Sequence, residues 1–454
     1  MRRRLIDALP LLAVAVLGHL PVLGAWWFHD DWVFLADAAG IVPRGDGLVR
    51  PVTYQLYWSA LWPLFGLTPW LWAATRLALH AGAAVLVARL AGHGGLDRHG
   101  QLVAGLLFAA APVAFESLAW GTGAVELLGA VFALAAVERW LAGGRRARWA
   151  ALALAAFAVL SKESGLLLVV FFAFSLGREG RLRSPLAAGT AALAFLGAWA
   201  ALQVVRDFDT TADYAIVPGL VPRNLLVLGS WLLTPGPLLR DSTLTATVGL
   251  AAGAVAWGLW GLAVQATRPE RRPFAAGCLG LGLLALLPAA VTGDHAVPRY
   301  VYAPFAAVAV GAAVLVYPAR GPSRRTLVLL TVLLLAGTAG STLYQQDARH
   351  PSGRPLHRLV FKEEVSRLAC RTIIRAGIGP GEQVVFLRDE GTDAGQMALL
   401  EDVLAGDRAL RLLAWQDAAA VWRDRPDPAD RGAFVFLVRG AMLVPRGRAA
   451  GDGG

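Results

Sequence analysis

The chain has 454 residues, of which 56% are hydrophobic and only 16% are Asp, Glu, Lys or Arg. Soluble globular domains run at about 45–50% apolar and about 25% charged residues, so this composition excludes an ordinary soluble enzyme, a disordered chain and a fibrous repeat. The net charge of +10 comes mostly from arginines in short clusters between apolar runs. That pattern is typical of cytoplasmic loops and not of a nucleic-acid-binding face, so we expect an integral membrane protein that binds no nucleic acid.

Apolar runs alternate with polar turns over residues 1–344, which we expect to form a helical membrane domain. Arg2, Arg3 and Arg4 precede the first run and no small-residue cleavage site follows it, which predicts a retained first helix with its basic start in the cytoplasm. The expected spans are 5–27, 70–90, 102–115, 122–141, the two arms of 149–176, 186–205, 243–265, 274–291, 301–317 and 327–344. Segment 224–239 is expected to be re-entrant or interfacial, because a further span there would place the basic 268–272 loop outside. The sequence thus predicts eleven spans and an external C-terminus, in the inner or plasma membrane of the cell.

The run 149–176 is interrupted by Ser161-Lys162-Glu163-Ser164 and is flanked by arginines on both sides, which predicts a hairpin. Each arm is only about 18–20 Å long at 1.5 Å per residue, whereas the hydrocarbon core is about 30 Å thick. Lys162 and Glu163 are therefore expected below the outer membrane surface, in a water-filled cavity or the bundle interior. The alternative is that the two side chains simply pair with each other.

Residues 345–454 predict a small extracytoplasmic α/β domain, so the expected fold class is an α-helical polytopic membrane protein with a small C-terminal α/β domain. The expected elements are a helix at 356–375, a turn at 377–381, a strand at 384–387, a helix at 395–404 and strands at 410–415 and 434–438. This part has no Gly-rich phosphate loop, no nucleophile elbow and no metal-ligand spacing.

Polar groups in or near a bilayer are costly, so their distribution indicates where function lies. The predicted topology gathers polar side chains from five turns and helix ends at the outer face. They are His29, Asp30, Asp31, Arg50, Glu116, Glu126, Lys162, Glu163, Asp294, His295, Arg299 and Tyr300.

Asp30 and Asp31 follow the first span directly, and adjacent carboxylates raise each other's pKa toward the range of a useful general base. Inverting glycosyl transfer needs one such base against an acceptor hydroxyl. With His29 beside them, the two aspartates could alternatively hold a divalent cation, although the sequence requires no cofactor. The alternative is that the two aspartates only lie where the chain leaves the membrane and have no further role.

Further candidates lie at the ends of other spans. Glu116 and Glu126 could assist the base, bind a metal ion or orient a sugar hydroxyl, or could be interfacial residues beside Trp120. Arg299 could clamp a lipid-linked phosphate or snorkel to the surface. Arg76 and His80, one turn apart in the second span, favour a phosphate site and a core ion pair equally.

Several short motifs occur together in a distinctive order over residues 25–305. They are His29-Asp30-Asp31-Trp32, Arg50-Pro51-Val52, Leu64-Phe65-Gly66-Leu67-Thr68-Pro69, Leu79-His80, Ala111-Pro112, Glu116-Ser117-Leu118-Ala119-Trp120, Leu160-Ser161-Lys162-Glu163-Ser164 and Pro298-Arg299-Tyr300-Val301-Tyr302-Ala303-Pro304. In this order the chain resembles the membrane domain of GT-C glycosyltransferases, in particular the protein O-mannosyltransferases and the transmembrane, tetratricopeptide-repeat mannosyltransferases.

The resemblance implies a polyprenyl-phosphate monosaccharide donor, with mannose as a candidate sugar, and an acceptor hydroxyl on a protein or glycan. It implies that Asp30 or Asp31 is the catalytic base. It also implies that the donor's phosphate and sugar are bound by Lys162, Glu163, Arg299 and Tyr300, with Arg50 and His80 in the same group of motifs.

The chain departs from the family in lacking the tetratricopeptide array and in having Asp-Asp where the O-mannosyltransferases have Asp-Glu. Region 206–239 matches no motif of the family. Two other classes of function remain open: a transporter or lipid-linked sugar flippase, and a non-catalytic scaffold. A transporter favours polar groups on both faces and an internal repeat, whereas here they favour one face and no repeat is evident.

Overall fold

A computed structural model describes residues 8–41, 49–181, 183–208, 217–233, 269–291, 297–316 and 324–349. It also describes parts of 251–265 and most positions of 351–449 outside 389–407 and 414–417. The predicted span 243–265, the predicted helix 395–404, Asp294 and His295 fall wholly or largely outside the described residues.

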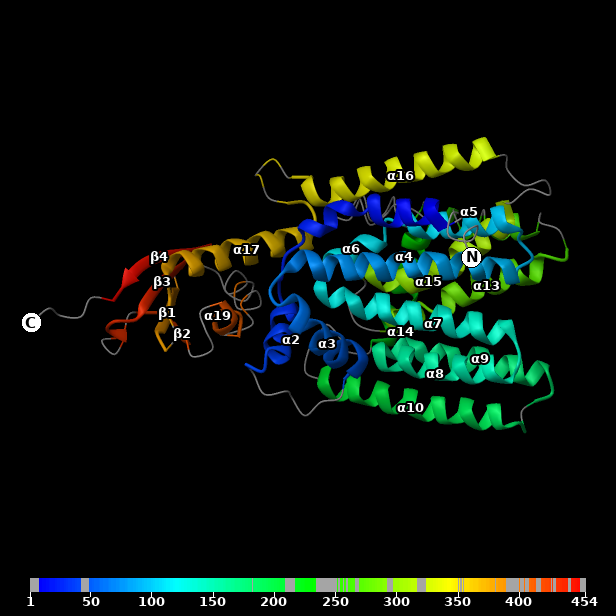
Figure 1. Cartoon of the computed structure of the whole chain (residues 1–454), viewed down its shortest axis with the longest axis horizontal. Helices are drawn as coiled ribbons and strands as arrows, with labels where there is room; N and C mark the ends of the chain where they lie inside the picture. Colours follow the sequence, from blue (N-terminus) through cyan, green and yellow to red (C-terminus); the bar gives the residue numbers. More distant parts are fainter. Residues whose placement is uncertain are drawn as a thin grey trace, which may run out of the picture.

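Six helices in the described part are long and apolar enough to cross a membrane, which indicates an integral membrane protein. Their ends differ from those of six predicted spans by less than one helical turn. They are α4 (Pro69–His93), the η4–α7 unit (Gly121–Ala142), α10 (Pro185–Phe208), α13–α14 (Arg272–Ala290), η9–α15 (Pro298–Val316) and α16 (Arg324–Asp347). Figure 1 shows these helices side by side in an elongated bundle.

Shorter helices complete the bundle. The first apolar run is helical over Ala8–Leu17 and continues as a 3-10 helix, η2 (Leu20–Gly24). The others are α5 (Arg98–Ala109), α8 (Arg145–Ser161), α9 (Leu167–Arg178) and α11 (Val221–Leu233). Two Arg148 nitrogens donate to the two Glu179 oxygens at 2.6 and 2.7 Å, which joins the start of α8 to the end of α9 and confirms the predicted hairpin.

Two histidines hydrogen-bond to the C-terminal end of α5. The Ala109 carbonyl, at the C-terminus of α5, has no partner within its own helix and accepts hydrogen bonds from His19 Nε2 at 3.2 Å and His80 Nε2 at 3.1 Å. The other nitrogen of His19 contacts Thr342 Oγ1 of α16 at 3.1 Å. This arrangement ties the first helix, α4, α5 and α16 together inside the bundle.

The C-terminal part contains α17 (Arg358–Ala376) and a four-stranded sheet in the order β2-β1-β3-β4. The strands are β1 (Gln383–Arg388), β2 (Ala419–Arg423), β3 (Phe434–Arg439) and β4 (Met442–Arg448). β1 pairs in parallel with β2 and β3, while β4 runs antiparallel to β3 at one edge. The predicted helix at 356–375 and the strands at 384–387 and 434–438 are confirmed.

The predicted strand at 410–415 is wrong, because α19 (Arg408–Leu413) occupies that position as a helix. Its residues Arg-Ala-Leu-Arg-Leu-Leu are strong helix formers, and a short apolar run does not distinguish a strand from a helix by periodicity alone. Strands β2 and β4 were not expected from the sequence. β4 contains Pro445 and Gly447, which weaken a strand signal and are tolerated at a sheet edge.

The sheet domain packs directly on one end of the bundle, which we call the sheet-side end (Figure 1). One continuous core joins Trp27, Trp58 and Trp72 of the bundle to apolar residues of α17 and the sheet. Trp32 Nε1 also donates to Ser366 Oγ of α17 at 3.1 Å. The short elements α2 (Asp30–Ala38), η3 (Pro51–Tyr57), α3 (Trp58–Phe65) and α6 (Ala114–Ala119) lie at this end.

Candidate active site

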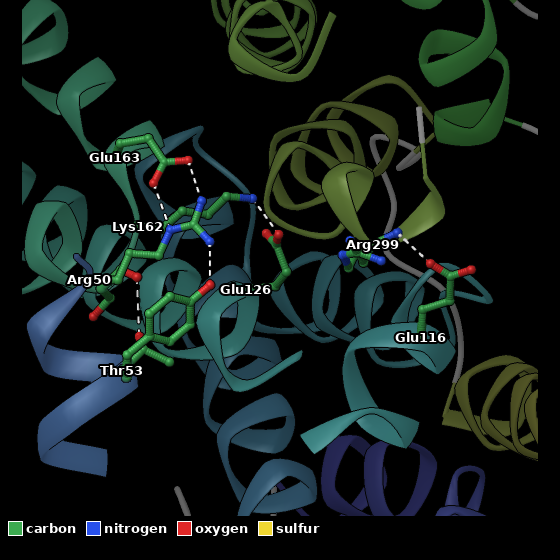
Figure 2. Close-up of polar contacts among 9 residues, drawn as sticks. Arg50, Thr53, Glu116, Glu126, Lys162, Glu163 and Arg299 are labelled. Atoms are coloured by element: carbon green, nitrogen blue, oxygen red, sulfur yellow. Dashed lines mark hydrogen bonds and ion pairs between the residues drawn. The ribbon is translucent and has the colours of Figure 1, made fainter. Parts of the chain in front are cut away.

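Most of the polar residues singled out from the sequence meet at the sheet-side end. They come from the start of α2, from η3, from α6 and the following turn, from η5 (Glu163–Leu166) between α8 and α9, and from η9 (Pro298–Val301). Figure 2 labels Arg50, Glu116, Glu126, Lys162, Glu163 and Arg299, together with Thr53, and marks polar contacts in which they take part. The fold thus brings together side chains that are separated by more than a hundred residues along the chain.

The backbone of this region is strained at two positions. His29 (φ 51°) and Arg50 (φ 45°) are the only non-glycine residues with positive φ in the described part of the chain. His29 precedes α2, and Arg50 precedes Pro51, whose ring disfavours the ordinary helical conformation of the residue before it. Each such conformation costs about 1–3 kcal/mol and persists only where the surroundings enforce it, which is typical of functional sites.

The two adjacent aspartates point in different directions. Asp31 is fully buried, and its carboxylate accepts hydrogen bonds from the Thr122 N–H (2.8 Å), the Thr122 hydroxyl (2.9 Å) and the Phe28 N–H (3.3 Å). The Asp30 side chain is 41% exposed, and its Oδ1 lies 3.2 Å from His29 Nε2. Asp31 therefore holds α2 against the start of η4–α7, while the Asp30 carboxylate is accessible to solvent.

Burial raises the pKa of Asp31 from its ordinary value of 3.8 to about 7, although Arg76 and Thr122 favour the ionised form. The folded protein then holds this proton more tightly than the unfolded chain does. The stabilisation from Asp31 is fully present below about pH 3.8 and is lost as the pH rises through about 7.

We therefore expect the thermal midpoint of the purified protein in detergent to fall more steeply between about pH 4 and pH 7 in the wild type than in Asp31→Asn. The neutral amide removes the titrating proton from this position. Asp37→Asn on the same helix is the matched control and should keep the wild-type slope. Equal slopes in the wild type and Asp31→Asn would contradict the assignment.

Arg50 connects η3 to the α8–α9 hairpin. Its Nε and Nη2 donate to the two Glu163 oxygens at 2.9 and 2.8 Å, and its Nη1 donates to the Tyr54 hydroxyl at 2.6 Å. Thr53 Oγ1 also donates to the Ser161 carbonyl at 3.1 Å. The bidentate ion pair is largely buried and fixes the turn that carries Lys162 (Figure 2).

Lys162 makes an ion pair with the buried carboxylate of Glu126 on α7 (Figure 2). Its ammonium also lies 4.7 Å from the centre of the Tyr300 ring. Lys162 and Glu163 therefore do not pair with each other, and each is bound to a charge on another element. The Lys162 cation faces the η9 segment, where Arg299 follows next.

Arg299 adds a second cation next to Tyr300. Its guanidinium lies 4.5 Å from the Trp120 ring and 5.1 Å from the Tyr300 ring, while its backbone N–H donates to Glu116 Oε2 at 3.3 Å. The other Glu116 oxygen lies 3.8 Å from His357 Nε2, just before α17. Glu116 thus connects the η9 segment to the beginning of α17.

The structure places His80 and Arg76 on α4 in the interior of the bundle and not in this cluster. His80 uses both ring nitrogens, since Nε2 bonds the Ala109 carbonyl and Nδ1 lies 2.9 Å from the Tyr302 hydroxyl. Arg76 is 2% exposed, and its Nε donates to the Leu118 carbonyl at 2.7 Å. Arg76 therefore supports the α6 segment and the buried Asp31.

The described residues contain no group of three or more His, Cys, Asp or Glu side chains arranged to hold a metal ion. His29 and Asp30 are adjacent, but the carboxylate of Asp31 is directed toward Thr122. The three residues suggested as metal ligands therefore do not converge in this conformation.

The cluster combines one accessible carboxylate, three cationic side chains and three aromatic side chains. The carboxylate is Asp30, the cations are Arg50, Lys162 and Arg299, and the aromatic residues are Tyr54, Trp120 and Tyr300. Tyr54 and Thr122 were not singled out from the sequence. The four-residue spacing from Arg50 to Tyr54 in the sequence, close to one helical turn, was the available signal for Tyr54.

No protein-family model matches the chain, and no curated protein is significantly similar to it in sequence.

Proposed function

We propose that the protein is a membrane glycosyltransferase of the GT-C type, with eleven spans and with the candidate site and the C-terminal domain on the extracytoplasmic side. It would transfer a monosaccharide from a polyprenyl-phosphate donor to a hydroxyl of a protein or glycan acceptor, with inversion. The observation that carries the proposal is that the accessible Asp30 and the cations Lys162 and Arg299 lie at one end of the bundle, in a region with two strained residues.

In the proposed reaction, the oxygen of the acceptor hydroxyl attacks the anomeric carbon of the sugar, and the Asp30 carboxylate takes the proton of that hydroxyl. The bond between that carbon and the phosphate oxygen breaks, and polyprenyl phosphate leaves with the bonding electrons. Lys162 and Arg299 supply positive charge for this leaving group, and Tyr300 and Trp120 provide ring faces beside them. Asp31 acts by positioning α2 and does not touch the reacting atoms.

The proposal is tested by supplying the purified protein with a panel of polyprenyl-phosphate sugars, beginning with mannose, and measuring release of polyprenyl phosphate. A candidate acceptor extract is included, and Asp37→Asn serves as the matched control for Asp30→Asn. We expect one donor to be turned over by the wild type and Asp37→Asn and not by Asp30→Asn. Binding of a donor without turnover in the presence of acceptors would favour a flippase or transporter, and failure to bind any donor would favour a scaffold.

A further inference from the structure

A separate groove lies between the end of the first apolar segment, the start of α4 and the outward face of α17. It has a volume of about 340 Å³, and its lining includes Gly24, Trp26, Pro69, Trp70, Arg367 and Arg371. None of these residues belongs to the candidate active site. The lining contains two arginines and no acidic residue.

The two arginines are four residues apart on α17 and therefore lie on the same face of the helix. Arg367 is held in place, because it donates to the Gly24 carbonyl and to Glu363 Oε1 and its guanidinium lies 5.5 Å from the Trp26 ring. Arg371 is exposed at the next turn. One fixed and one exposed guanidinium at this spacing suit the oxygens of a phosphate group.

The start of α4 adds to this positive potential. Pro69 is the first residue of this 25-residue helix, and Thr68 before it makes no side-chain cap hydrogen bond. Because Pro69 and Trp70 line the groove, the positive end of the helix dipole lies beside it, where it favours an anion.

The rest of the lining is apolar and matches the border of a bilayer. Trp70 is 53% exposed and lines the groove together with Trp26, at the level where the first apolar segment ends and α4 begins. Tryptophan is enriched at this level of membrane proteins, because its ring suits the headgroup region. A ligand here would contact the acyl region on one side and the arginines on the other.

We propose that this groove binds the phosphate headgroup of an anionic phospholipid of the surrounding bilayer. The lipid would bridge α17 to the start of α4 and so attach the C-terminal domain to the membrane domain. The site needs only a bilayer around the six long helices and is independent of any glycosyl transfer. A bilayer lipid, not the sugar donor, is inferred because the groove shares no residue with the Lys162–Arg299 cluster.

The test is native mass spectrometry of the full-length protein, titrated in detergent with phosphatidylglycerol, phosphatidylcholine or a polyprenyl phosphate. The variants are Arg371→Gln and Arg367→Gln, and Arg375→Gln is the matched control one turn further along α17. Arg371→Gln is the main variant, because Arg367 also holds the Gly24 segment.

We expect the wild type and Arg375→Gln to retain phosphatidylglycerol, and Arg371→Gln to bind it about tenfold more weakly, since a charge-assisted hydrogen bond is lost. Phosphatidylcholine should bind more weakly than phosphatidylglycerol to the wild type. Equal retention of phosphatidylglycerol by Arg371→Gln and Arg375→Gln would overturn the proposal. Stronger retention of polyprenyl phosphate, lost in Arg371→Gln, would overturn it in favour of a site for the donor or product lipid.

Discussion

Asp30→Asn is expected to lower the rate of sugar transfer by a factor of about 10²–10⁴, which is the usual contribution of a general base. The amide has nearly the same size and cannot take the proton of the acceptor hydroxyl. Because the Asp30 side chain is 41% exposed, its replacement should leave folding intact. The measurement is kcat from release of polyprenyl phosphate, together with the thermal midpoint of the same preparations.

Asp31→Asn should give the opposite combination of effects. Its side chain accepts three hydrogen bonds in a fully buried position, two from Thr122 at Oδ1 and one from the Phe28 N–H at Oδ2. The amide oxygen of Asn can replace one of these oxygens, but the NH2 group that replaces the other cannot accept a hydrogen bond. We expect a lower thermal midpoint at neutral pH and an activity loss that follows the loss of folded protein. Full activity of Asp30→Asn at the wild-type level would reject Asp30 as the base.

Lys162→Gln is expected to have two separable effects. It removes a cation proposed to neutralise the leaving phosphate, and the loss of such electrostatic stabilisation typically lowers kcat by about 10²–10³. It also leaves the Glu126 carboxylate buried without its ion-pair partner, which typically destabilises a protein by about 3–5 kcal/mol. Activity per folded molecule and the thermal midpoint are both measured.

The double variant Lys162→Gln/Glu126→Gln separates these effects, because two neutral amides can hydrogen-bond to each other in place of the ion pair. We expect it to regain most of the lost stability and to stay at least about 100-fold less active than the wild type. Recovery of activity together with stability would show that the pair is structural and that Lys162 does not assist the leaving group.

The sequence was informative where the membrane imposes a simple rule. Long apolar runs predicted six helices with nearly correct ends, since every backbone group in a bilayer must be satisfied within the segment. The arginines on both sides of the short apolar arms around Lys162 predicted the α8–α9 hairpin. The polar side chains of five turns were expected at one level, and contacts in the structure do join the described ones from η3, η5 and η9, with His29 beside Trp120.

The pairing within that cluster could not be predicted. Arg50 and Glu163 are 113 positions apart, and nothing local in either segment specifies the other. The division of labour between Asp30 and Asp31 also depends on Thr122, which only the folded chain brings to Asp31. In the C-terminal domain, the low strand propensity of Ala419 and Ala420 concealed β2, because edge strands depend on their neighbour more than on their own residues.

Helix α17 has different neighbours at its two ends. His357, just before the first turn of α17, contacts Glu116, and Glu116 accepts a hydrogen bond from the backbone N–H of Arg299. Further along, Cys370 and Ile373 are buried in the core shared with the sheet. A 19-residue helix is a stiff rod of about 28 Å. We therefore expect a displacement of the sheet along this axis to move His357 relative to Glu116 and the Arg299 segment.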